Sequence, residues 1–308
     1  MDKKIGIAIG IIVVISAASL GISIAGYLQA TKEKIEIVEV PMDGVGFEGP
    51  VNTGTSNGYL IEFENGVKFY FSGDTALFGD MKFIIGDYYK PDVAFLPIGG
   101  FYTMGSEEAA YATTLINPKY VIPYHYHVFL EMAQTADEFV DEVNGYKEKG
   151  ATRAEPIVLE YGVEREIEGI TVLWLGHAQF VFESVNGTRI IIDPWLEANP
   201  DCPAKYKNFS AFEDIDLILL THGHADHLTL EEIDELTRLY NPVILAQWEL
   251  GIYLSGKVST TNIVLLNKGS YITKKEMIES SMLRVEPEID ENIKIMLVHA
   301  DHSSSPQL

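Results

Sequence analysis

The chain has 308 residues, of which 47% are hydrophobic and 22% are charged, a composition typical of a globular protein and not of a disordered one. Its 22 basic and 45 acidic residues give a formal charge of -23, and such a surface repels phosphate backbones, which argues against nucleic-acid binding as the main function. The single cysteine, Cys202, excludes an internal disulfide framework and a multi-cysteine zinc site.

The first segment differs in composition from the rest of the chain. Residues 5–28 carry no charge and consist mainly of Ile, Val, Ala, Leu and Gly. The run exceeds the roughly 20 residues that cross a bilayer as a helix and is too long for the apolar region of a cleaved signal peptide, about 7–15 residues. We expect residues 1–33 to form an N-terminal membrane anchor. Lysines on both sides leave the orientation open under the positive-inside rule, and the usual placement of a signal anchor favours an extracytoplasmic domain.

Beyond the anchor, short β-rich runs alternate with helical stretches, which predicts an α/β fold. Asn-Gly pairs at 65–66 and 186–187 predict hairpins. The segment 145–169 is the expected seam between two β-rich halves. Strands are expected at 58–63, 67–72, 93–98, 120–125, 156–160, 170–176, 215–220, 243–247 and 294–300, and helices at 106–116, 135–143 and 230–240.

The histidines fall in a few short segments, and the densest follows the strand expected at 215–220. There the sequence reads THGHADHL, which places His222, His224, Asp226 and His227 within six residues. Side chains two apart at the end of a strand point the same way, so the first two histidines can bind one ion. Asp226 and His227 can reach a second ion after the turn. Imidazole and carboxylate ligands suit zinc, manganese or iron.

These residues resemble a known family. THGHADH is similar to the H-x-H-x-D-H motif of the metallo-β-lactamase superfamily. VLWLGHAQF with IIDPW, and FSGDTALFGDM with PIGGFYTMGSEEAAYA, resemble its metal-dependent hydrolases related to ascorbate-6-phosphate lactonase and to the phospholipase D that cleaves N-acyl-phosphatidylethanolamine. The resemblance covers roughly residues 50 to 308 and implies a four-layer αββα sandwich for residues 34–308.

The resemblance also implies a ligand set for two divalent ions, most simply zinc, with manganese or iron as alternatives. The first ion would be held by His222, His224 and His302, and the second by Asp226, His227 and His125, with Asp74 bridging both. Asp193 matches a buried acid behind the ligands. Catalytic or pocket roles would fall to Asp226, His177 and Tyr102, although a lone buried His177 can equally be a structural group. His127 and His299 match no family ligand and are interpreted as rim or structural residues.

The order of the motifs departs from that family. In the family the chain runs LGHA, IIDP, H-x-H-x-D-H, HSS, GDT and the last histidine, whereas here GDT and the last histidine come first. The order indicates a circular permutation, with residues 34–168 equivalent to the family's C-terminal half and 169–308 to its N-terminal half. Residues 34–46 resemble the strand that precedes HSS, so the site could close within one chain or between chains of a homo-oligomer.

The resulting hypothesis is a membrane-anchored metal-dependent hydrolase that acts on an ester, lactone or phosphodiester of a small-molecule or lipid-like substrate. Two cations lower the pKa of a water from about 15.7 toward about 7, which makes hydroxide available at neutral pH. The alternative is a non-catalytic metal-binding or assembly protein that retains the fold. Retention of all seven expected ligands favours the enzyme.

Overall fold

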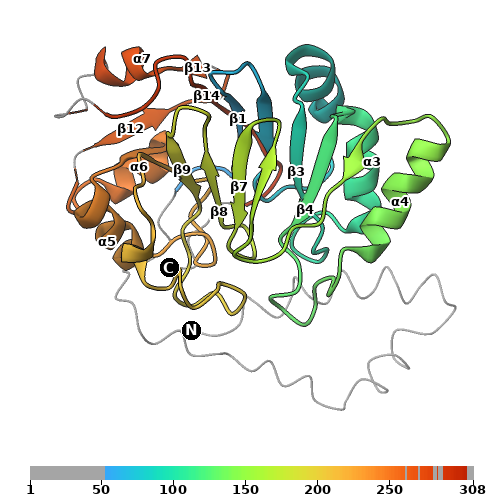
Figure 1. Cartoon of the computed structure of the whole chain (residues 1–308), viewed down its shortest axis with the longest axis horizontal. Coiled ribbons are helices and arrows are strands. Elements are labelled where there is room, and N and C mark those ends of the chain that lie inside the picture. The colour runs from blue at the N-terminus through green and yellow to red at the C-terminus, as the bar shows by residue number, and fades with distance from the viewer. Residues whose placement is uncertain (1–52, 261, 270, 280–282, 284–286, 304–308) are drawn as a thin grey trace, which may run out of the picture. The chain divides into compact units, whose positions relative to one another are not determined.

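The structure is a computed structural model that describes residues 53–260, 262–269, 271–279, 283 and 287–303. In this part of the chain the strands form two seven-stranded sheets (Figure 1). The order in the first sheet is β13-β14-β1-β2-β3-β4-β5, and the order in the second is β12-β11-β10-β9-β8-β7-β6. The described residues all belong to one compact unit. The predicted α/β class with two sheets is therefore confirmed.

The first sheet draws its strands from both ends of the described chain. Its strands are β1 (Asn57–Glu62), β2 (Lys68–Phe71), β3 (Val93–Pro97), β4 (Tyr120–Tyr124), β5 (Glu155–Pro156), β13 (Tyr271–Ile272) and β14 (Lys294–His299). A π-helix η1 (Met81–Tyr89) and helices α3 (Ser106–Ile116) and α4 (Asp137–Glu148) accompany this sheet, and the short helix α7 (Lys274–Glu279) follows β13.

The second sheet is continuous in sequence. Its strands are β6 (Glu164–Ile167), β7 (Ile170–Trp174), β8 (Phe180–Glu183), β9 (Arg189–Ile192), β10 (Leu217–Leu219), β11 (Val243–Gln247) and β12 (Ile263–Leu266). A 3-10 turn η2 (Phe209–Ala211) and helices α5 (Leu230–Tyr240) and α6 (Trp248–Leu254) accompany it. In Figure 1, α3 and α4 lie on one outer side of the molecule and α5 and α6 on the other.

Alternation along the strands of the second sheet divides its side chains between two cores. In β8, Phe180 and Phe182 face the core shared with the first sheet, while Val181 joins the core on the outer face. That outer core includes Ile233 of α5 and Leu250 of α6. Successive residues of a strand point to opposite faces, so each strand serves both layers. Aromatic rings close the gap between the sheets, with Phe69 and Phe182 centroids 5.4 Å apart.

The last long strand completes the first sheet beside the first described strand. β14 pairs antiparallel with β1 from Asn57 opposite His299 to Glu62 opposite Lys294. β14 therefore runs parallel to β2, and both strands end at the same edge of the sheet. One chain can bring residues after β14 next to residues after β2 in this way. The similar segment 34–46 lies outside the described residues.

In the described residues, no helix has the length and apolarity to cross a membrane. The anchor predicted at residues 5–28 lies outside that part of the chain.

Tyr59 of β1 joins the two sheets next to the segment that carries His222, His224 and His227. Its hydroxyl is fully buried and lies 2.8 Å from Leu220 O and 3.0 Å from Leu245 O. Burial, reinforced by the charge of Asp193, raises the pKa of Tyr59 well above its usual value, so the hydroxyl keeps its proton and donates to these carbonyls. The bond fixes the end of β10 against the first sheet.

We expect Tyr59→Phe to lower the free energy of unfolding by about 1–3 kcal/mol, because two buried carbonyl oxygens lose their shared donor. Urea denaturation followed by circular dichroism measures the change. Tyr111→Phe is the matched control, since Tyr111 is 44% exposed on α3. Equal stability of the Tyr59 variant and the control would refute the role given to this bond.

Candidate metal centre

The candidate ligands occupy the connections that follow the carboxyl ends of strands. Asp74 follows β2, His125 directly follows β4, His222 follows β10, and His302 follows β14. In open α/β sheets this edge is where ligands bind. Seven side chains from four separate segments of the chain therefore meet at one edge shared by the two sheets.

Gly73 lets the chain turn beside the centre at a point where no side chain fits. Its φ is +64°, in the left-handed region that favours glycine, and a Cβ there would lie 2.2 Å from Asn57 O. The neighbouring Asp74 is only 2% exposed. Close approach of the β1 and β2 ends thus brings the carboxylate inward.

Three histidines form the first group of candidate ligands. His222 Nε2 lies 2.9 Å from His224 Nδ1, and His302 Nε2 lies 3.4 Å from the same Nδ1. Nitrogen ligands at about 2.0–2.1 Å from a tetrahedral zinc ion stand about 3.3 Å apart. The spacing of the three ring nitrogens fits one such ion.

His222 and His224 come close together for a different structural reason from the one expected from the sequence. β10 ends at Leu219, so His222 and His224 lie in the loop after the strand, where alternation no longer fixes their direction. They converge because one ring presents Nε2 and the other presents Nδ1. Thr221 helps to orient the first ring, since its Oγ1 lies 2.9 Å from His222 Nδ1.

The second group lies on the other side of Asp74. Its Oδ2 is 3.0 Å from His125 Nε2 and 3.3 Å from His227 Nε2, and His227 Nε2 is 4.0 Å from Asp226 Oδ2. The same carboxylate oxygen is 3.9 Å from His222 Nε2 and 3.9 Å from His302 Nε2. Asp74 therefore stands between the two groups, in the position of a bridging ligand.

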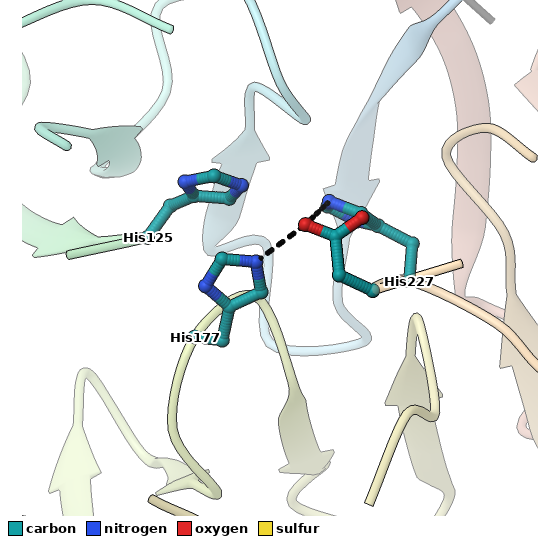
Figure 2. A group of neighbouring side chains, drawn as sticks. His125, His177 and His227 are labelled. Carbon is teal, nitrogen blue, oxygen red and sulfur yellow. Dashed lines mark hydrogen bonds and ion pairs between the residues drawn. The ribbon is translucent and has the colours of Figure 1, made fainter. Parts of the chain in front are cut away.

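His177 approaches the second group from the connection between β7 and β8. Figure 2 shows the rings of His125, His177 and His227 gathered around one carboxylate, which belongs to Asp226. His177 Nε2 lies 3.0 Å from Asp226 Oδ2, and the His125 and His177 ring centroids are 3.9 Å apart. Burial, together with the His125 ring, lowers the pKa of His177 to about 4 against the opposing charge of Asp226. Its position leaves His177 within reach of an ion held by Asp226 and His227.

Asp193 lies behind the ligands and is fully buried. Its Oδ2 is 2.8 Å from His227 Nδ1 and accepts a 2.6 Å bond from Thr221 Oγ1, while its Oδ1 accepts a bond from Thr221 N. A carboxylate on the far nitrogen of a histidine fixes the ring's tautomer and direction. His227 Nε2 is thereby turned toward Asp74 and Asp226.

The donor atoms of this cluster suit a divalent cation. Asp74 Oδ1 is buried and has no hydrogen-bond partner among the described residues, and the buried His125 Nε2 and His227 Nε2 both face the single oxygen Asp74 Oδ2. Leaving such atoms unpaired costs about 1–3 kcal/mol each, and more for charged groups. Imidazole nitrogens and carboxylate oxygens are ligands that a divalent ion satisfies. The residues present therefore fit metal ions at this centre.

The charges within the cluster also favour the binding of a cation. Burial opposes ionisation of Asp74, yet the His125 and His227 imidazoles outweigh it and hold the pKa of this carboxyl well below its usual value. Asp226 behaves alike: burial opposes its ionisation, and His227 and His177 lower its pKa. Both carboxyl groups are anionic at neutral pH and available to a cation.

The remaining candidate residues lie around the centre and not in it. Tyr102 is half exposed, and its ring centroid is 6.4 Å from that of Phe129 at the rim. His127 pairs with Asp201 at 3.0 Å. His299 lies 3.2 Å from Lys268 Nζ and packs edge-on against Phe78.

Five backbone positions near the centre adopt positive φ without being glycine: Phe101, His125, His127, His177 and Asp193. Such conformations cost about 1–3 kcal/mol each and persist where surrounding structure enforces them, often at functional sites. Sequence reasoning did not single out Phe101 or Asp201. The Gly-Gly pair before Phe101 is the one local signal of an unusual turn.

Comparison with known proteins extends these findings. Relatives with the printed name "UPF0173 metal-dependent hydrolase" include one from Methanosphaera stadtmanae, 49% identical over 90 residues, which are 29% of this chain and 38% of that protein. Another, TK0141 from Thermococcus kodakarensis, is 39% identical over 142 residues, 46% of this chain and 59% of the relative. The matches thus span about two-fifths to three-fifths of these curated relatives.

Among solved structures, the metallo hydrolase Igni18 from Ignicoccus hospitalis is 28% identical, with 51% of this chain and 74% of that chain covered and a TM-score of 0.30. The metallo-beta-lactamase fold protein YhfI from Bacillus subtilis is 12% identical, with 74% and 95% covered and a TM-score of 0.43. A family model described as "Beta-lactamase superfamily domain" matches residues 19–125 and 171–302, which is more than half of the chain. The chain belongs to the beta-lactamase superfamily.

Proposed function

We propose that this protein is a metal-dependent hydrolase with a dinuclear site, in which metal-activated water attacks an ester, a lactone or a phosphodiester. The observation that carries the proposal is Asp74 Oδ2, which lies within 3.9 Å of histidine nitrogens from both groups of candidate ligands. The names of relatives such as TK0141 also support a metal-dependent hydrolase.

Two divalent ions, most simply zinc, would supply a water of lowered pKa and an electrophile for the substrate oxygen. His222, His224 and His302 would hold the first ion, and Asp226, His227 and His125 the second, with Asp74 bridging. Manganese or iron would also suit this donor set.

Asp226 and His177 would have separate roles in the reaction. Asp226 is 26% exposed at its side chain, so it faces both the buried histidines and the solvent from which substrate enters. Its Oδ2 is held by His177 Nε2, which fixes the direction of the carboxylate. Asp226 would orient the attacking water, and His177, a neutral imidazole whose one N–H points to Asp226, would keep that carboxylate in place.

Three further proposals concern the chain as a whole. The motif order supports a circular permutation relative to ascorbate-6-phosphate lactonase and the N-acyl-phosphatidylethanolamine phospholipase D. The apolar run 5–28 supports a single membrane anchor with the hydrolase domain outside the cytoplasm, although the family match begins at residue 19, inside that run. The structure of a single chain brings the seven proposed ligands together around Asp74, which supports a site that closes without a second copy.

We expect two transition-metal ions per chain, because seven ligands exceed by three the number that one tetrahedral ion uses. Elemental analysis of protein purified without chelator measures the ratio, and protein treated with chelator and reloaded with zinc gives the titration. One ion per chain at saturation would contradict the dinuclear site.

We expect Asp74→Ala and His224→Ala each to lower kcat for ester or phosphodiester hydrolysis by more than about 100-fold, since loss of even an outer partner of a metal ligand costs about 10- to 100-fold. Circular dichroism would verify that both variants remain folded. Asp87→Ala is the matched control, because Asp87 lies on η1 and pairs with Lys82. Near-wild-type turnover of either ligand variant would remove that residue from the site.

A further inference from the structure

A row of aromatic rings leads from the surface to the metal centre. Neighbouring ring centroids are 4.7 Å apart for Phe101 and Tyr102, 6.4 Å for Tyr102 and Phe129, and 5.8 Å for Phe129 and His177. On the other side of His177 the Trp195 ring follows at 5.6 Å. We call these residues, with Leu130, the aromatic wall. The aromatic wall thus passes His177, the histidine that holds Asp226.

The outer part of the aromatic wall is exposed in a way that apolar side chains seldom are. Phe101 is 77% and Leu130 92% exposed, and Phe129 is more than one-third exposed. Single exposed apolar residues are common on protein surfaces, whereas apolar side chains that adjoin one another mark a surface that contacts something. This surface is continuous with the proposed reaction centre, which identifies substrate as the occupant.

The loops that carry the aromatic wall are held in one conformation by their own hydrogen bonds. Ala133 N donates to Gly99 O at 2.9 Å, which ties the loop after β4 to the loop after β3. Gln134 Nε2 donates to Phe129 O at 3.0 Å. Phe101 also keeps a φ of +54°, a conformation that costs energy and is enforced by its surroundings. The wall is therefore preformed, which lowers the entropy lost on binding.

Charge around the aromatic wall restricts what it can bind. The connections 98–105, 125–136, 175–179 and 221–229 contain no Lys and no Arg, whereas the connection after β9 carries Lys205 and Lys207, of which Lys207 donates to Glu197 O and Asn199 O. These connections also contain Glu131, Glu197 and Asp201 beyond the proposed site carboxylates. A substrate with an anionic group beside Phe101 and Phe129 would meet Glu131 and no cation from the two loops that carry these rings.

We propose that the aromatic wall binds an uncharged apolar group of the substrate, an alkyl chain or aromatic ring, on the His177 side of the bond that is hydrolysed. The proposal rests on the proposed hydrolase function and narrows its substrate class. Among substrates of matched reactivity, kcat/KM should increase with the apolar area that each substrate buries against Phe129 and Phe101.

The first test uses the full chain loaded with zinc and p-nitrophenyl butyrate, hexanoate and octanoate. For the wild type, kcat/KM should rise about twofold to fourfold per added methylene, as expected for burial of each group. Phe129→Ala and Phe101→Ala should weaken the dependence of kcat/KM on chain length. Phe129→Leu should restore most of this dependence. Phe83→Ala, which removes a 64% exposed ring on η1, is the control and should keep the wild-type slope.

The second test measures binding without turnover, by calorimetry with butyrate, hexanoate and octanoate. Affinity should rise with chain length in the wild type and much less in the Phe129→Ala variant. If the wild type hydrolyses no substrate, the proposed function fails, and calorimetry still decides on the aromatic wall. Hydrolysis that is independent of chain length in the wild type would overturn the inference and leave the hydrolase standing.

A membrane contact is the competing use of the same surface. Weaker binding of the Phe101 and Phe129 variants to neutral phosphatidylcholine vesicles, with an unchanged chain-length series, would assign the wall to the membrane and overturn the proposal.

Discussion

The buried carboxylate of Asp193 holds together the parts from which the candidate metal centre is built. It receives Thr221 N and Thr221 Oγ1 from the loop after β10 and lies 2.8 Å from His227 Nδ1. An ionised carboxylate at full burial is costly unless it is well bonded, and burial does raise the pKa of Asp193 against these hydrogen bonds. Loss of this group would leave Thr221 without its acceptor and His227 free to turn away from Asp74. The position of the second group of ligands therefore depends on a residue that is not itself a ligand.

The two sheets contribute unequally to this arrangement. The second sheet supplies Asp193 and the loop with His222, His224, Asp226 and His227, so much of the centre can form within one continuous segment. The first sheet supplies Asp74, His125 and His302, and it does so only because β14 pairs with β1 and ends beside β2. Tyr59 then ties the first sheet to the carbonyls at the ends of β10 and β11. Packing between the sheets therefore brings two incomplete sets of candidate ligands together into one candidate centre.

Much of this could be predicted from sequence because the strongest signals are local. The helices expected at 106–116 and 230–240 match α3 and α5, since each carries a clear helical pattern and ends at an asparagine in the left-handed conformation. The grouping of Asp74 with His125 and His302 came from family resemblance, because no local pattern reports a contact between residues so distant in the sequence. The π-helix η1 and the short α6 were not predicted, since a nine-residue and a seven-residue segment rich in aromatic and aliphatic side chains give no distinct period. The aromatic wall was also missed apart from Tyr102, because its members come from loops after different strands and meet only in the folded chain.

A crystal structure of the zinc-loaded protein, with anomalous diffraction at the zinc edge, tests the central claim most directly. The account predicts two anomalous peaks separated by about 3.5–4 Å, as in other two-metal sites. One peak should lie among His222 Nε2, His224 Nδ1 and His302 Nε2, and the other among Asp226, His227 Nε2 and His125 Nε2, with Asp74 between them. A single peak, or two peaks that do not share Asp74, would contradict the bridging role on which the proposed chemistry is built.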